Sequence, residues 1–199
     1  MTFTDMFLNE EINEAGQSSK RVIDNDKYYG IQEGKLIRIY AKRKFGNVKA
    51  GQKGGLIEKE SNLSSKGNCW VYSDGDAQVY DDAKVYGNAR VYGYAIIYGN
   101  AEVYGNAKIY DDGIVLEDAR VYDNAEVYGY AKIYNDAQIY DHAQVYGGAE
   151  VYDSGEVYGN AQVYGNAKVH DNAEVYGDSK IAGNNEIAGN DLIFNTNLL

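Results

Sequence analysis

The sequence offers few side chains that commonly perform catalysis. It contains two histidines, His142 and His170, and a single cysteine, Cys69. A histidine can act as a general base that takes a proton from an acceptor hydroxyl, and His142 is the candidate catalytic residue if the protein is an enzyme. The alternative is that both histidines are surface substitutions, because His142 lies in a polar turn segment and His170 stands where tyrosine usually recurs.

No metal or cofactor site is predicted. One cysteine cannot build a disulfide framework or a thiolate zinc site, and two histidines cannot supply the three of a catalytic zinc centre. The aspartates occur among glycines and asparagines, without the nonapeptide pattern of calcium-binding repeats, so we interpret them as solvated turn residues. The sequence also lacks a glycine-rich phosphate loop and a nucleophile elbow.

The residues that surround these candidates form a regular repeat. The 199-residue chain contains 21 Tyr, 23 Gly and no Pro, a bias that is typical of repeats. The unit reads Ala-x-Val-Tyr-Gly-Asn, and its aliphatic position recurs every six residues, 20 times, from Val79 to Ile193. A small residue stands two positions earlier, and tyrosine follows the aliphatic residue in 15 of the 20 units. Cys69 occupies the small position before Val71, so we expect it in the core.

Each unit is a very short strand followed by a turn. Alternation places the small and aliphatic residues on one face and tyrosine on the other, while Gly, Asn and Asp accept the backbone of a tight corner. Strands this short bury their inner face only when successive coils stack. The predicted fold class is all-β: a triangular, single-stranded parallel β-helix of about 6.7 coils with three units each, preceded by a small N-terminal hairpin and cap.

The pattern resembles the hexapeptide repeat of the left-handed β-helix superfamily, which includes many acyltransferases. The resemblance covers Cys69 to Phe194 and implies left-handed winding. In that superfamily a histidine acts as general base near a loop extruded between coils, at a subunit boundary of a trimer; His142 is the counterpart here, but these hexads contain no loop. The lead-in FGNVKAGQKGGLIEKESNLSSKGNCWVY, residues 45–72, resembles bacterial and phage proteins of the YdcK type, which are described as transferases without a demonstrated reaction.

Charge divides the chain into three parts. The net charge of −11 is the sum of −4 in residues 1–26, +7 in residues 27–68 and −14 in residues 69–199. We assign residues 1–27 to a helical or extended segment, in which Thr2 or Thr4 would cap a short helix. Residues 28–68 form the basic hairpin and cap, and residues 69–199 form the β-helix with an apolar tail. A linker is expected from Gly16 to Lys20.

Two electrostatic surfaces are candidates for binding. The basic segment 38–53 suits phosphate or nucleic acid, although the acidic rod is an alternative partner within the same chain. Conversely, a slim anionic rod imitates the charge of duplex nucleic acid and suits the binding cleft of a nucleic-acid enzyme. The basic residues are Arg38, Lys42, Arg43, Lys44, Lys49 and Lys53.

An apolar patch is predicted on one face of the rod. Stacking at 18 residues per coil brings Ile96 beside Ile114 and places aromatic residues at the neighbouring positions. Such a patch on a polar rod indicates either a contact surface for a partner or a site covered by residues 1–26. Its members are Tyr94, Ile96, Tyr98, Ile114, Leu116 and Tyr130.

The C-terminal tail is apolar on both faces of its last strand. It either folds over the last coil as a cap or docks onto a second subunit of a homo-oligomer, a dimer or trimer. The residues that would do so are Leu192, Phe194, Leu198 and Leu199.

We therefore expect a non-enzymatic β-solenoid that binds a protein partner, with a phage-type inhibitor of a host nucleic-acid enzyme as its sharpest form. The alternatives are an acyltransferase with an acyl-CoA site between rods, for which His142 is the discriminating residue, and a self-assembling structural element. No run approaches the length of about 18 apolar residues that a membrane span needs, and the N-terminus lacks a signal-peptide layout. We expect a cytoplasmic location in a bacterial host and no membrane partner.

Overall fold

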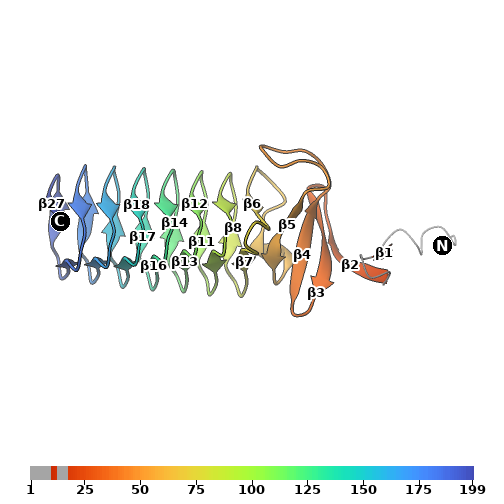
Figure 1. The fold of residues 1–199 in the computed structure, drawn as a ribbon, viewed down its shortest axis with the longest axis horizontal. Helices are drawn as coiled ribbons and strands as arrows, with labels where there is room; N and C mark the ends of the chain where they lie inside the picture. The colour runs from red at the N-terminus through yellow and green to blue at the C-terminus, as the bar shows by residue number, and fades with distance from the viewer. Residues whose placement is uncertain (1–9, 13–17) are drawn as a thin grey trace.

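The chain winds into a three-sided parallel β-solenoid. The computed structural model describes residues 10–12 and 18–199. Figure 1 shows a straight rod whose N-terminal end is covered by an antiparallel sheet and whose C-terminus lies at the opposite end. The strands form sheets of 12, seven and eight members. The described residues contain one helical element, the short 3-10 helix η1 (Glu60–Asn62).

The first sheet begins with five longer strands and continues into the rod. These five are β1 (Glu10–Ile12), β2 (Ser18–Asp24), β3 (Tyr28–Glu33), β4 (Leu36–Ala41) and β5 (Lys53–Ile57). The rod strands of this sheet are β7 (Gln78–Val79), β10 (Ile96–Ile97), β13 (Ile114–Val115), β16 (Lys132–Ile133), β19 (Glu150–Val151), β22 (Lys168–Val169) and β25 (Glu186–Ile187).

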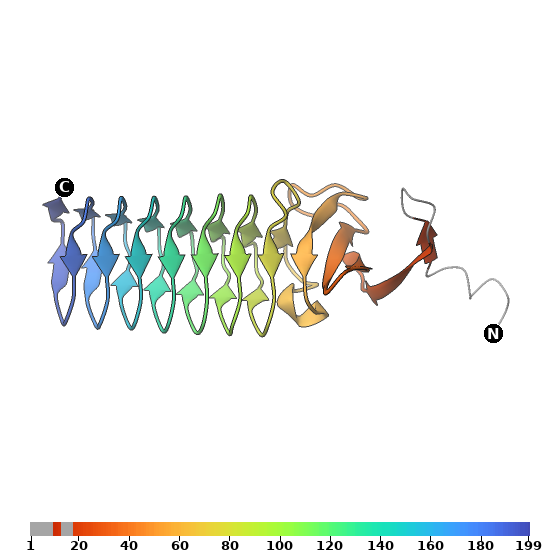
Figure 2. The same cartoon turned by 60° about the horizontal axis from the view of Figure 1, so that its bottom comes forward.

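The other two sheets consist of rod strands alone. The second sheet contains β8 (Lys84–Val85), β11 (Glu102–Val103), β14 (Arg120–Val121), β17 (Gln138–Ile139), β20 (Glu156–Val157), β23 (Glu174–Tyr176) and β26 (Leu192–Phe194). The third sheet contains β6 (Trp70–Val71), β9 (Arg90–Val91), β12 (Lys108–Ile109), β15 (Glu126–Val127), β18 (Gln144–Val145), β21 (Gln162–Val163), β24 (Lys180–Ile181) and β27 (Asn197–Leu198). Figure 2 shows how each coil contributes one strand to each side.

The repeat produces the core as its pattern predicts. Each aliphatic residue pairs in parallel register with the residue one coil later, as Val79 does with Ile97 and Ile97 with Val115. From Ala77 to Val175, the Ala and the Val or Ile side chains of these inward positions are at most 1% exposed. Corners turn through residues with positive φ, such as Gly105 (66°) and Asp123 (55°), a conformation that glycine and aspartate tolerate best.

The structure has about eight coils, slightly more than the 6.7 expected from the hexads alone. The irregular chain before the hexads forms a further coil, in which Ile57 pairs with Val79, Leu63 with Val85 and Val71 with Val91. The aliphatic residues of this coil are not spaced by six, so the hexad pattern does not reveal it. The rod consequently begins near Lys53 instead of residue 69, while the left-handed sense implied by the resemblance stays a prediction.

The N-terminal cap is a continuation of the first sheet. Strand β5 pairs antiparallel with β4 on one side and parallel with β7 on the other. The predicted hairpin is confirmed, since β3 and β4 pair throughout and turn at Gly34, which has a φ of 63°. Tyr28 and Phe45 contact the fully buried ring of Trp70 at the junction between cap and rod.

The segment before residue 27 is extended where the structure describes it. Glu10–Ile12 and Ser18–Asp24 are paired antiparallel strands, and Ser18–Asp24 also pairs with β3. Of the helical and extended alternatives for residues 1–27, the described residues show the extended one, and the linker expected at 16–20 is wrong from Ser18, because sheet pairing overrides local propensity. The rest of both predictions, including Thr2 and Thr4, lies outside the described residues.

Outward side chains stack in columns along the rod. Tyrosine rings of successive coils lie nearly parallel with centroids about 5 Å apart, as for Tyr104 and Tyr122 at 4.9 Å and 2°. Asparagine amides at the corners also bond from coil to coil, as Asn106 does to Asn124 at 3.1 Å. These contacts order the exterior as well as the core.

The C-terminal tail continues the coil instead of folding across it. Strand β26 pairs with β23, and β27 pairs with β24 in a register that opposes Lys180 to Asn197. Leu198 packs against the core, whereas Leu192, Phe194 and Leu199 are exposed by 62%, 55% and 80%. None of the helices in the described part of the chain has the length and apolar character needed to cross a membrane.

Candidate interaction surface

The predicted apolar patch lies on the first sheet of the rod. Ile96 on β10 pairs with Ile114 on β13, and both side chains point outward with intermediate exposure. Tyr94 and Tyr130, at the corners beside them, are exposed by 67% and 70%. Leu116 interrupts the tyrosine column of this sheet.

From Gln78 to Glu186, the outward position occupied by Ile96 and Ile114 is otherwise polar, while Leu56 occupies it in the first coil. Along the same sheet, β10 pairs with β7 and β13 pairs with β16, where the equivalent residues are Gln78 and Lys132. Because polar residues occupy this position without disturbing the coil, packing of the rod does not require isoleucine there. A polar residue could therefore take the structural place of either isoleucine.

The described part of the N-terminal segment does not cover the patch. Strands β1 and β2 pair at the far side of β3, beyond the N-terminal end of the rod (Figure 1). Tyr94 and Tyr130 are the large apolar residues that stay exposed between Cys69 and Asn190. Residues 1–9 and 13–17 lie outside the described residues.

Neither histidine has the surroundings of a general base in a cleft. His142 is exposed at a corner, where its Nε2 lies 3.4 Å from Nδ2 of Asn124 as the next step of an asparagine column. His170 takes the place of a tyrosine, stacks on Tyr152 at 4.7 Å and lies 2.8 Å from the carboxylate of Glu186. Both histidines continue a column of the exterior.

The structure also contains one cluster of metal-ligating groups that was not predicted from the sequence. Ligand atoms of Asp153, His170 and Asp171 lie within 4.8 Å of one another. Asp153 accepts a 2.8 Å hydrogen bond from Asn135 Nδ2, and Asp171 accepts one of the same length from the backbone of Gly189. The 18-residue coil brings Asp153 and Asp171 together, so the predicted stacking would have identified them.

The basic residues predicted to form one patch fall into two groups. Arg38 is only 4% exposed, because its guanidinium bonds Asp76 at 2.6 Å, Glu33 at 3.0 Å and the carbonyl of Gly54. It is a structural residue, and the prediction that it belongs to an accessible basic surface is wrong. Lys42 pairs with Asp24 at 2.7 Å. Arg43, Lys44, Lys49 and Lys53 are exposed.

A buried amine accompanies the single cysteine. Cys69 is fully buried, as its position in the repeat predicts, and Lys27 Nζ lies 3.2 Å from its Sγ. Lys27 also donates a 2.9 Å hydrogen bond to the carbonyl of Ser64. Burial lowers the pKa of the Lys27 ammonium and raises the pKa of the Cys69 thiol. The pair joins the cap to the first coil.

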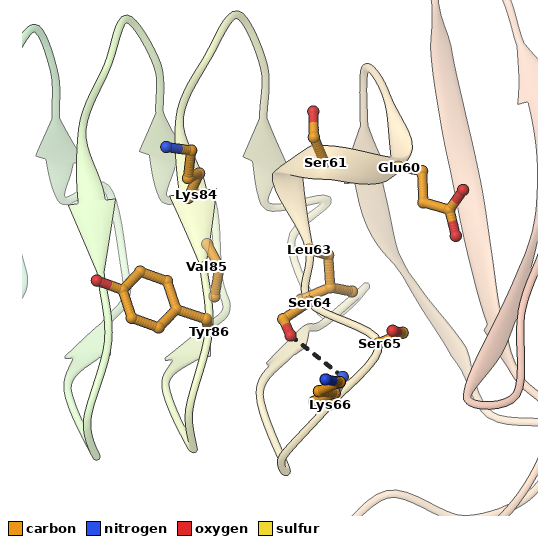
Figure 3. A pocket seen from close by; sticks show the side chains of 9 residues that line it. All are labelled: Glu60, Ser61, Leu63, Ser64, Ser65, Lys66, Lys84, Val85 and Tyr86. Atoms are coloured by element: carbon orange, nitrogen blue, oxygen red, sulfur yellow. Dashed lines mark hydrogen bonds between the residues drawn. The ribbon is translucent and has the colours of Figure 1, made fainter.

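Two cavities lie where the irregular first coil meets the regular rod. The larger, of about 490 Å³, opens between the loop after η1 and strand β8 (Figure 3). It is lined by Glu60, Ser61, Leu63, Ser64, Ser65, Lys66, Lys84, Val85 and Tyr86. The smaller, of about 330 Å³, is lined by Tyr72, Asp74, Arg90, Tyr92 and Lys108. His142 lines neither of them.

Comparison with protein families supports the repeat assignment. The family model described as the YdcK beta solenoid repeat matches residues 83–99, which include β8, β9 and β10. Residues 83–99 are therefore similar to a YdcK-type β-solenoid repeat. A comparison with curated proteins finds no match. The YdcK-type repeat and the stacked coils both indicate a β-solenoid.

Proposed function

We propose that this YdcK-type solenoid is a non-enzymatic binding protein that holds a protein partner on its apolar patch. The supporting observation is the exposure of Tyr94 and Tyr130, by 67% and 70%, around two outward isoleucines on an otherwise polar rod. Exposed tyrosine beside aliphatic residues is typical of the central part of protein interfaces.

The rod presents this patch with little conformational freedom. Backbone bonds tie each patch residue to the next coil, as from Tyr94 N to the Asp111 carbonyl at 2.7 Å and from Ile96 N to the Gly113 carbonyl at 3.1 Å. A surface that is ordered before binding loses little entropy when a partner docks. The regular corners, without an extruded loop, favour binding across a flat face.

The finer form of the proposal is a phage-type inhibitor that blocks a nucleic-acid enzyme in a bacterial cytoplasm. It is supported by the net charge of −14 in residues 69–199 and by acidic side chains at successive corners. Acidic residues such as Asp118, which accepts a hydrogen bond from Asn100, recur at the corners of the rod. Binding by charge imitation would be sensitive to salt, whereas binding by the apolar patch would resist it.

The patch can be tested with a double variant. Ile96→Lys and Ile114→Lys place residues there that the same column already accepts at Lys132 and Lys168. With the tagged protein as bait in host extract, the wild type should retain a partner at high salt and the double variant should lose it. Lys132→Ala is the matched control and should retain the partner. Equal retention by the wild type and the double variant would contradict binding through the patch.

The two alternatives have separate tests. An acyltransferase would bind acyl-CoA in calorimetry, form a trimer and lose activity in His142→Asn, but its support is the superfamily resemblance alone. A self-assembling element would form filaments at high concentration. That alternative is disfavoured because β3 and β4 cover the N-terminal end of the rod. A monomer that binds no acyl-CoA and forms no filaments agrees with the binding proposal.

A further inference from the structure

The larger cavity lies where the tyrosine column of the second sheet lacks one ring. This missing ring is called the vacant step. From Tyr86 onward, each ring in this column stacks on the next, starting with Tyr86 and Tyr104 at 4.8 Å and 3°. The position before Tyr86 belongs to Ser64, because Leu63 pairs with Val85. The backbone confirms the register: Ser64 N bonds the Val85 carbonyl at 3.0 Å, as Tyr86 N bonds the Val103 carbonyl at 3.1 Å.

The neighbouring position, that of Asn62, also lacks a side chain that points outward. In the same register Asn62 lies before Lys84, but its side chain is fully buried. The Asn62 amide accepts a 2.8 Å bond from Lys59 N and donates one of the same length to the Ala83 carbonyl. Two neighbouring outward side chains are therefore missing from this coil, and the space of about 490 Å³ takes their place.

One ring face of Tyr86 consequently borders open space. Figure 3 shows Tyr86 on the β8 side of the cavity, with its ring leaning toward the next coil, and Ser64 and Lys66 on the facing loop. The orientation of the Tyr86 ring is fixed by stacking on Tyr104 and by a 2.8 Å hydrogen bond from its hydroxyl to Glu102. A flat ring in the cavity would have a preformed stacking surface.

The charged groups around the cavity favour an anion. Lys66 and Lys84 are exposed, and Lys84 Nζ forms a long ion pair of 3.6 Å with Glu102, the carboxylate that also accepts the Tyr86 hydroxyl. The acidic residue of the lining, Glu60, already accepts a 2.8 Å bond from Asn25. Three serines, Ser61, Ser64 and Ser65, add hydroxyl groups to the same lining.

We propose that this cavity binds a planar aromatic ring that carries an anionic group. The ring stacks on Tyr86 as the missing step of the column, and the anion is held by Lys66 and Lys84. Nucleoside monophosphates and simple aryl phosphates share this chemistry, and both fit a cavity of this size class. The site uses different residues from the apolar patch, so its failure would leave the proposed function untouched.

Calorimetry on the full chain separates the parts of the proposal. The probes are adenosine 5′-monophosphate and phenyl phosphate, with adenosine and ribose 5-phosphate as halves that lack the anion or the ring. We expect at least one of the two complete probes to bind saturably, and each half to bind at least about tenfold more weakly. Preference for the nucleotide over phenyl phosphate would identify a nucleotide site, and the reverse would identify a simpler aryl anion. If neither complete probe binds, the proposal is overturned.

The decisive variant fills the vacant step. Ser64→Tyr should stack on Tyr86, raise the unfolding midpoint and abolish binding of the probe. Ser154→Tyr is the matched control, because Ser154 occupies the corner position at which Tyr94 and Tyr130 already occur. This control should bind as the wild type does. Lys84→Gln should weaken the phosphate probe without changing the unfolding midpoint, and it covers the case in which Ser64→Tyr misfolds. Unchanged binding in both Ser64→Tyr and Lys84→Gln would place any bound probe elsewhere.

Discussion

The hydroxyl of Tyr140 donates a 2.9 Å hydrogen bond to Oε2 of Glu156, which lies 16 residues later on the next coil. The same kind of bond recurs in two of the three sheets, so individual rings of the stacked columns are each tied to a carboxylate on the next coil. Because the acceptor is ionised, the bond favours the protonated hydroxyl. The equivalent pairs are Tyr86–Glu102, Tyr110–Glu126 and Tyr158–Glu174.

Partial burial of the stacked tyrosines predicts loss of stability at alkaline pH. Burial, reinforced by neighbouring rings and carboxylates, raises the pKa of Tyr122 and of Tyr134 from 10.0 to about 12. A group whose pKa is higher in the folded state contributes stability that is fully present below its unfolded pKa and is lost as pH rises through the folded value. Unfolding free energy should therefore fall between pH 10 and about 12, as measured by urea titration.

A matched variant assigns the effect to the carboxylate. Burial and the Glu156 bond together raise the pKa of Tyr140. Glu156→Gln keeps the size of the acceptor and removes its charge, so the pKa of Tyr140 should move back toward its ordinary value. Ultraviolet titration of tyrosinate would show ionisation beginning earlier than in the wild type, with Tyr140 shifted most. Asp118→Asn, which removes a corner carboxylate bonded to an asparagine amide, is the control. An unchanged titration in Glu156→Gln would refute the assignment.

The interrupted column of the first sheet predicts a stabilising substitution. Leu116 stands between Tyr98, which stacks on Tyr80, and Tyr134, which stacks on Tyr152, so the column lacks a ring at this one step. Leu116→Tyr should stack on both neighbours and raise the unfolding free energy by about 0.5–1.5 kcal/mol for each ring pair formed. Urea denaturation measures the change. Leu116→Ala, which adds no ring, should lower stability, and an equal loss in both variants would show that the column does not extend through this step.

The regular rod was predictable because one period controls both core and surface. The six-residue spacing of Val79 to Ile193 determines which side chains are buried and which columns form, so Tyr94 and Tyr130 were correctly expected on the outside. The first coil was not predictable in this way. Its aliphatic residues are Ile57, Leu63 and Val71, and their unequal spacing hides the register.

The wrong or missing predictions therefore lie in the cap and the first coil, where the six-residue period is absent. Arg38 was expected among the accessible basic residues, but the cap buries it and supplies partners from distant segments. The vacant step at Ser64 is visible only after Leu63 is known to pair with Val85. Contacts at that distance along the chain depend on tertiary packing, which no local pattern encodes.

Glu117 occupies a corner for which its side chain is poorly suited. Its φ is 58°, in the left-handed region, where the other non-glycine corners of the rod are aspartate or asparagine. Its carboxylate accepts a 2.9 Å bond from Asn135 N, and the shorter Asp141 carboxylate accepts the equivalent bond from Gly159 N at 3.2 Å. Glu117→Asp should keep the bond, relieve the backbone and raise the unfolding free energy by up to about 1 kcal/mol.

The reverse substitution provides the control for that corner. Asp123 has a φ of 55° in the same position of the next unit. Asp123→Glu should lower stability by a similar amount, because it introduces the longer side chain into the same strained backbone. If the two substitutions changed urea stability in the same direction, backbone strain would not be the cause.

Arg38 and Lys49 belong to the same basic segment but are expected to have different roles, structural for Arg38 and binding for Lys49. The buried guanidinium of Arg38 bonds Asp76, Glu33 and the carbonyl of Gly54, whereas Lys49 is an exposed charge in the same basic segment. Arg38→Gln should destabilise the fold by about 2–3 kcal/mol, since the Gly54 carbonyl and two carboxylates lose a charged donor. Lys49→Gln should leave stability unchanged. If the segment binds nucleic acid, Lys49→Gln should weaken that binding and reduce its salt dependence, while equal stability of both variants would show that the Arg38 contacts do not hold the cap to the rod.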